Sequence, residues 1–225
     1  MIIAMPSYAI HVHEDRNDLE TLLAQKHRLK VAISVQANNT GANPSNFNVV
    51  YQSVPLSPNM HLCWTGQYAL NWISHIPADG TRLENFNGNW QPWRPGESYS
   101  LHKTGCWDKA SPKRGLRIHD TIEVSGNDHG SVHVVVGLQR SEHSGKTTWV
   151  PIFIDKSELA KGGGRRYELD HRVKMWFGTE DSDSTMVSRA ELASTSSSTT
   201  ETLTMRSEVW IRYNTLRRKW ETANL

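Results

Sequence analysis

Aromatic side chains are the residues of this sequence whose type and spacing best suit ligand binding. Nine tryptophans occur in 225 residues, and Trp90 and Trp93 fall close to Phe86 in the irregular segment 75–96. An indole joins a large apolar ring to a polar N–H group, so tryptophan is common where a protein surface meets a ligand. We predict that the ligand-binding residues are Trp64, Trp72, Phe86, Trp90 and Trp93.

Four titratable residues, His75, Asp79, Glu97 and His102, lie in or next to the same segment. They are the candidate catalytic residues, because general acid–base groups often stand at the rim of a substrate pocket. A connection as long as 75–96 is uncommon unless it is functional or disordered, and three large aromatic rings argue against disorder. We therefore expect the site at one end of the fold, although the same rings would also serve to fill that end as core.

Two pairs of histidines have a spacing that suits a metal ion. His11 and His13 alternate on one expected strand, and His119 and His133 flank a turn that contains Asp128 and His129. Neutral imidazole is the commonest metal ligand, but a polar strand face and ordinary cross-strand pairing are the favoured explanations of these residues. We predict no metal site and no cofactor, and the sequence leaves open whether either pair binds a metal.

The segment 162–166, Gly-Gly-Gly-Arg-Arg, combines free backbone N–H groups with two guanidinium groups, as an anion site would. It lacks the Gly-Lys-Ser/Thr ending of a phosphate loop, so a flexible loop is the favoured interpretation. Cys63 and Cys106 have no neighbours that would activate a thiol. We expect both cysteines to be reduced and dispensable for activity.

Period-two alternation of apolar and polar residues, broken by Gly, Asn, Asp and Ser clusters, runs through most of the chain and indicates strands. It is clearest in residues 116–154, which we expect to form a three-stranded antiparallel meander. A single apolar stripe predicts one helix inside residues 15–28. The predicted fold is all-β: a two-sheet antiparallel β-sandwich of about ten strands with one N-terminal helix, in which residues 1–225 form a single domain.

Charge and hydropathy exclude some classes of partner. The 25 basic and 23 acidic residues are interspersed and give a net charge of +2, which argues against a nucleic-acid-binding surface. The basic run 217–219 is interpreted as a solvated chain end. No stretch approaches the roughly 20 apolar residues of a membrane span, and the N-terminus lacks a signal peptide, so we expect a cytoplasmic protein.

These observations favour a ligand-binding protein, lectin-like or binding a lipid or apolar small molecule through the tryptophan-rich segment. The alternative is a cofactor-free cyclase or isomerase that folds an apolar substrate in an aromatic pocket. The expected partner is a small molecule or glycan. Whether the protein is an enzyme, and whether it forms a homo-oligomer, stays open at this stage.

Overall fold

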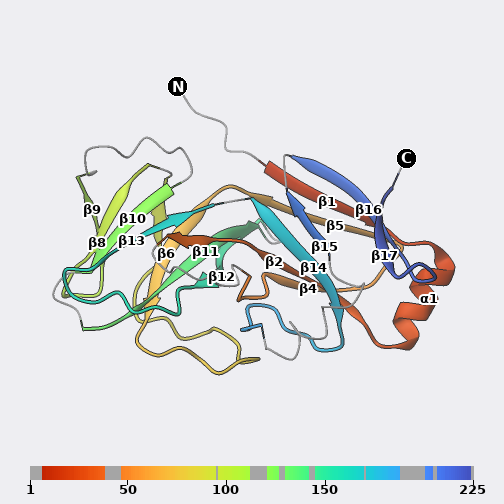
Figure 1. Ribbon diagram of the computed structural model, residues 1–225, viewed down its shortest axis with the longest axis horizontal. Coiled ribbons are helices and arrows are strands. Elements are labelled where there is room, and N and C mark those ends of the chain that lie inside the picture. Colours follow the sequence, from red (N-terminus) through yellow and green to blue (C-terminus); the bar gives the residue numbers. More distant parts are fainter. Residues whose placement is uncertain are drawn as a thin grey trace.

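The computed structural model of the protein describes residues 7–38, 47–94, 96–111, 121–126, 130–141, 145–169, 171–187, 201–204 and 207–223. Within these ranges the chain forms seventeen strands and one helix, so the prediction of an all-β protein with one helix is confirmed. The prediction of a two-sheet sandwich of about ten strands is wrong, because the strands form four sheets (Figure 1).

The helix α1 (Arg16–Ala24) lies inside the predicted range. Leu19 and Leu22 are buried against the sheets, as the apolar stripe predicts. The helix ends before Lys26, whose left-handed backbone (φ 56°) stops it. The last turn of this helix therefore contains no basic residue.

The β1 sheet has the strand order β17-β16-β1-β5 and a single buried face. Its strands are β17 (Lys219–Thr222), β16 (Glu208–Asn214), β1 (Ser7–His13) and β5 (Asn59–Thr65). Strands β1 and β16 are parallel, whereas the other neighbours are antiparallel. Buried and exposed residues alternate along β5 without exception, which is the pattern expected of a sheet with water on one side.

The β11 sheet, of order β12-β11-β6-β7, is covered on both faces. Its strands are β12 (Thr147–Ile154), β11 (His133–Ser141), β6 (Tyr68–Ile73) and β7 (Gln91–Trp93). All six residues of β6 are buried. The antiparallel β11–β12 pair confirms two strands of the predicted meander.

The β10 sheet, of order β3-β13-β10-β8-β9, takes the third strand of that meander. Its strands are β3 (Gln36–Asn38), β13 (Gly164–Glu168), β10 (Thr121–Gly126), β8 (Ser98–Leu101) and β9 (Trp107–Ala110). β10 pairs with β8 in parallel and with β13 antiparallel, so the predicted pairing of β10 with β11 is wrong. Side-chain period identifies the faces of a strand but not its partners.

The β14 sheet completes the fold with the order β15-β14-β2-β4. Its strands are β15 (Glu201–Thr204), β14 (Arg172–Gly178), β2 (Arg28–Ile33) and β4 (Gln52–Pro55). All of its neighbouring pairs are antiparallel.

Several short connections carry the chain from one sheet into another, so strands that are neighbours in the sequence belong to different sheets. β5 and β6 are separated only by Gly66 and Gln67. Likewise β2 leads into β3, and β13 leads into β14. A hydrogen bond from the Ser34 amide to the Arg172 carbonyl (2.9 Å) links the last two connections. A strand that bends in this way keeps its alternation, so the sequence does not reveal the change of sheet.

The apolar core has one main cluster and a second one across the β11 sheet. Val134 and Val136 belong to the main cluster, whereas Val135 belongs to the second. Successive strand residues point to opposite faces, so the second cluster lies on the other face of this sheet. Phe86 and Trp90 of the connection between β6 and β7 pack against it.

Candidate functional site

Three of the five predicted ligand-binding aromatics are core residues. Trp64 and Trp93 are buried. Trp64 stacks on Tyr8 with ring centroids 5.7 Å apart, and Trp93 meets the ring of Tyr68 edge-on at 5.8 Å. Their location favours the interpretation that these rings fill the fold.

Trp72, also buried, ties two connections to the β11 sheet. Its indole N–H donates to the Gly105 carbonyl oxygen (2.8 Å) in the turn between β8 and β9. The neighbouring Asn71 donates to the Gly88 carbonyl (3.1 Å) and accepts from the Gly88 amide (3.2 Å). A Cβ on Gly88 would lie 2.6 Å from the Trp72 indole nitrogen, so glycine is required there. These contacts explain why the long segment 75–96 is ordered.

Phe86 and Trp90 are the members of the set that remain partly exposed. Their rings lie 4.9 Å apart and tilted by 59°. The Trp90 ring covers Gly137 of β11, where a Cβ would come within 2.4 Å of it. A ligand role for these two residues stays a prediction.

The four predicted acid–base residues do not come together in one site, because each has different neighbours. His75 and Asp79 are exposed, and the His102 ring contacts the Thr104 hydroxyl (3.1 Å). Glu97 accepts hydrogen bonds from Lys109 and from the hydroxyl of Tyr99. Burial acts to raise the pKa of Glu97, but these hydrogen bonds outweigh it, so the pKa lies below its usual value.

A groove with a volume of about 410 Å³ lies on the β10 sheet. The groove crosses four neighbouring strands, β13, β10, β8 and β9. One residue of each strand lies in a row across it: Arg166 is paired with Glu123, Glu123 with Ser98, and Ser98 with Ala110. None of the predicted site residues lines it. The lining residues are Ser98, Tyr99, Ala110, Ser111, Glu123, Val124, Ser125, Gly164, Arg165 and Arg166.

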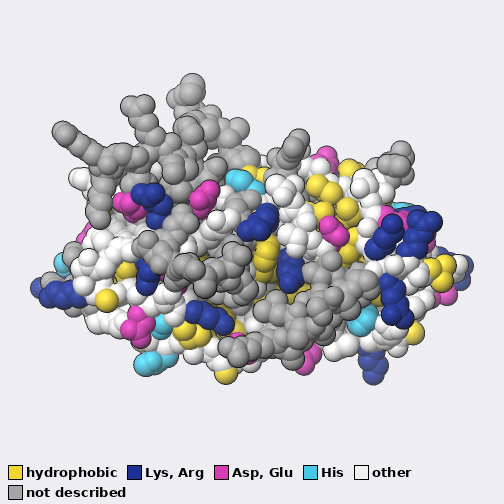
Figure 2. Space-filling view, viewed as in Figure 1, with side chains coloured by type: hydrophobic (Ala, Val, Ile, Leu, Met, Phe, Trp, Pro, Cys, Tyr) yellow, Lys and Arg dark blue, Asp and Glu magenta, His cyan; other side chains and the backbone are white. Residues whose placement is uncertain are grey.

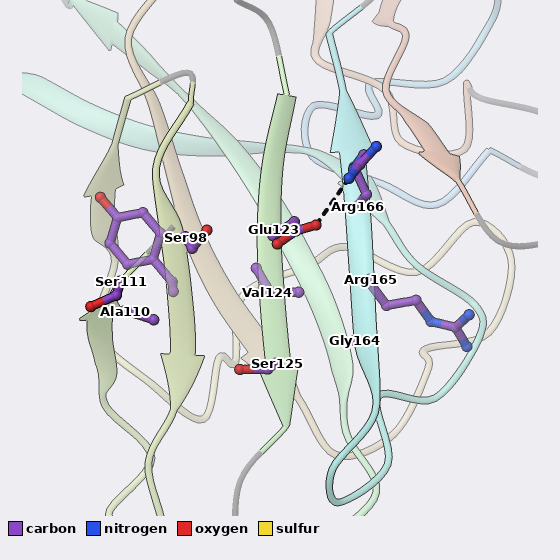
Figure 3. A pocket seen from close by; sticks show the side chains of 10 residues that line it. Ser98, Ala110, Ser111, Glu123, Val124, Ser125, Gly164, Arg165 and Arg166 are labelled. Carbon is purple, nitrogen blue, oxygen red and sulfur yellow. Dashed lines mark hydrogen bonds and ion pairs between the residues drawn. The ribbon is translucent and has the colours of Figure 1, made fainter. Parts of the chain in front are cut away.

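An ion pair crosses the middle of the groove. The Arg166 guanidinium donates to the Glu123 carboxylate at 3.0 Å, and Figure 3 shows the two side chains reaching toward one another. Arg165, one residue earlier on β13, extends away from them (Figure 3). The segment predicted as a flexible Gly-Arg loop is thus corrected, because residues 164–168 form strand β13.

Hydroxyl groups line the rest of the groove. Ser111 is exposed and Ser125 is half-buried, whereas Ser98 is buried. No hydrogen-bond partner for the Ser98 hydroxyl oxygen is found among the described residues. A buried polar group without a partner costs free energy, so a ligand that supplies one gains affinity when this hydroxyl rotates toward it.

A buried polar network lies on the other side of β13. The Tyr167 hydroxyl donates to the Asp155 carboxylate (2.8 Å), and Arg165 approaches the same carboxylate at 3.8 Å. Arg165 also donates to the Glu158 carbonyl at 3.1 Å. Burial, and then the Asp155 charge, raise the pKa of Tyr167 well above its usual value. This network fixes the position of β13 and occupies Arg165.

His11 and His13 have separate partners. His11 stacks between His61 (4.5 Å) and Trp210 (3.8 Å) and contacts Glu208, while His13 contacts Asn59. His119, Asp128 and His129 lie outside the described residues, and His133 is buried. In the described part of the chain no cluster of three or more His, Cys, Asp or Glu side chains suits a metal ion.

Both cysteines, Cys63 and Cys106, are free and exposed. Among the described residues, no helix has the length and apolar character needed to cross a membrane.

Comparison of the chain with protein-family models, curated proteins and solved structures gave no match. The function must therefore be argued from the groove and its surroundings.

Sequence reasoning missed the groove residues for a definable reason. Glu123 and Ser125 occupy the polar positions of an alternating run, so their outward direction was predictable. Their partners are not, because Ser98 reaches Glu123 through a parallel pairing and Arg166 comes from beyond β11 and β12. The Gly-Arg segment 162–166 was the one sequence feature that pointed to this groove. Its assignment as a flexible loop meant that Arg166 was not predicted as a site residue.

Proposed function

We propose that this protein is a lectin-like ligand-binding protein and that the groove on the β10 sheet takes a neutral, hydroxyl-rich small molecule or glycan. The observation that supports the proposal is the row Arg166, Glu123 and Ser98 across a groove of about 410 Å³. That volume lies in the range of small-molecule sites. The row presents a donor, an acceptor and a hydroxyl side by side, as a polyol requires.

The charges favour a neutral ligand over an anion. Arg166 and Glu123 neutralise one another across the groove, and Arg165 is occupied by Asp155 and Glu158. An anion would have to displace Glu123 from Arg166. A sugar hydroxyl instead donates to the carboxylate and accepts from the guanidinium while the pair stays intact. The serine-lined walls also disfavour a lipid in this groove.

The Phe86–Trp90 pair is a second location for the ligand. Both rings are partly exposed, and an aromatic face on a rigid sheet suits stacking against the apolar face of a sugar ring. The cyclase or isomerase alternative has no comparable support, since His75, Asp79, Glu97 and His102 do not line the described groove. It stays a prediction.

Isothermal titration with neutral oligosaccharides, a sialylated oligosaccharide and a fatty acid tests the proposal. We expect a neutral oligosaccharide to bind, and Glu123→Gln or Arg166→Gln to weaken it about ten-fold or more, the usual effect of losing a hydrogen bond to a charged group. Glu84→Gln and Arg82→Gln are matched controls, because they alter an exposed ion pair of 3.3 Å that is not part of the groove. These controls should leave the affinity unchanged.

Two results would contradict the groove assignment. Binding of the fatty acid alone would exclude the hydroxyl-rich ligand class. Loss of oligosaccharide binding in Trp90→Ala, with Glu123→Gln and Arg166→Gln as active as the wild type, would move the site to the Phe86–Trp90 pair.

A further inference from the structure

One end of the molecule, which we call the tip, is built from α1 and the turn between β16 and β17, residues 215–218. Asp18 of α1 accepts hydrogen bonds from the backbone amide and hydroxyl of Thr215, which fixes the turn against the helix. Figure 1 shows the tip at the end of the molecule opposite β8, β9 and β10. The groove therefore stays free when the tip makes contact with something else.

The tip carries the exposed apolar side chains. Among the described residues, only Leu23 and Leu216 are large hydrophobic residues classed as exposed, and both belong to the tip. Leu216 is 94% exposed. A single exposed leucine is unremarkable, but here both fall on the same end of the molecule.

Basic side chains surround Leu216. Arg217 and Lys219 share the carboxylate of Glu221, at 3.2 and 3.8 Å. The Arg217 side chain is 67% exposed, whereas that of Glu221 is only 16% exposed. The cations thus project beyond the carboxylate that pairs with them. Residues 217–219 are exposed, as the sequence interpretation of a solvated chain end expects, and they form a hairpin turn and the start of β17.

Further cations extend this surface. Arg218, held in a left-handed backbone conformation (φ 52°), and Lys26 make no ion pair with any described residue. Arg16 pairs with Glu20 at 2.9 Å. Figure 2 shows Lys and Arg side chains gathered at this end, with apolar side chains among them.

We propose that the tip docks on an anionic membrane surface, with Leu216 entering the boundary between headgroups and acyl chains and the surrounding cations contacting acidic headgroups. Such a surface accepts an isolated apolar side chain without a matching pocket. Juxtaposed Lys and Arg residues are attracted to acidic lipids. An acidic protein partner fits less well, because two separate leucines give little of the roughly 800 Å² per partner of a standard interface.

Co-sedimentation of the protein with phosphatidylcholine vesicles, with and without phosphatidylserine, tests this inference. The wild type should bind only the vesicles that contain phosphatidylserine, and high salt should release it. Leu216→Ala should reduce binding about ten-fold. Arg218→Asn removes one charge, suits the left-handed backbone, and should reduce binding about five-fold.

Lys103→Glu is the control, because it changes the charge of an exposed residue in the turn between β8 and β9 at the other end of the molecule. It should bind vesicles like the wild type. Equal binding to neutral vesicles, no binding to phosphatidylserine vesicles, or wild-type binding by both tip variants would overturn the proposal. Binding of soluble polyglutamate in place of vesicles would assign the tip to an acidic protein. None of these results depends on a ligand in the groove.

Discussion

The aromatic segment over the β11 sheet and the groove on the β10 sheet use their side chains in opposite ways. In the first, Trp72 and Trp93 are buried in the core, and the Trp72 indole N–H donates to the Gly105 carbonyl. In the second, polar side chains line an open groove, and no partner for the buried Ser98 hydroxyl is found among the described residues. Three of the five aromatic residues predicted to bind a ligand are core residues, while the proposed binding groove consists of residues that attract little attention in the sequence.

This contrast has a physical basis. Ordering a long connection costs conformational entropy, which buried rings offset. A ligand, by contrast, requires groups whose hydrogen-bonding capacity is not used up within the protein. The following substitutions separate these two roles, and we give them in order of decreasing effect on stability.

Trp72→Ala should have the largest effect, lowering the free energy of unfolding by about 3–5 kcal/mol. The ring is buried and its N–H holds the Gly105 turn. Urea denaturation measures the change, and Trp90→Ala, at a partly exposed ring, serves as the milder companion. A stability loss at Trp72 no greater than at Trp90 would break the distinction between core rings and surface rings.

Glu14→Gln shows what burial does to a carboxyl group that belongs to neither region. Glu14 is 2% exposed and accepts the Tyr213 amide through both oxygens, at 3.2 and 3.3 Å. Burial, reinforced by the charges of Asp18 and Asp15, raises its pKa from 4.5 to about 8, although the Tyr213 bond and Arg212 oppose the shift. The folded protein therefore penalises the ionised form.

The sign of the pH effect follows from this. The penalty is absent below pH 4.5 and complete above about pH 8, so this group lowers the stability of the wild type as the pH rises between those values. Glutamine does not ionise, and the variant should be more stable than the wild type by about 1–3 kcal/mol at alkaline pH and similar to it at acid pH. Melting temperatures across this range provide the measurement. A variant that loses stability equally at every pH would contradict the raised pKa.

Ser98→Ala should have the smallest effect on stability and the opposite direction from Trp72→Ala. Removing a buried hydroxyl that has no partner among the described residues should leave the protein unchanged or stabilise it by up to about 1 kcal/mol. The same substitution should weaken binding of the neutral oligosaccharide, which calorimetry would detect. A clear loss of stability would mean that this hydroxyl belongs to the structure and not to the binding surface.

The sequence predicted the local elements well and the assembly poorly. Helix α1 and the β11–β12 hairpin follow from the spacing of nearby residues. The pairing of β10 with β8 and β13 joins segments that are far apart in the chain, and no periodicity encodes it. The number of tryptophans does not by itself locate a binding site, because an apolar ring that can stack on a ligand can equally pack in the core.

The pairing of β1 with β16 affects how the protein is made. Ile10 lies opposite Val209 and Val12 opposite Ile211 in this parallel ladder. During synthesis β1 can pair with β5 early, but its other neighbour, β16, leaves the ribosome much later. Contacts between residues so distant in sequence slow folding, and an unpaired strand edge exposed meanwhile is prone to aggregation. The yield of folded protein should therefore depend on how long nascent chains are protected before residues 208–214 appear.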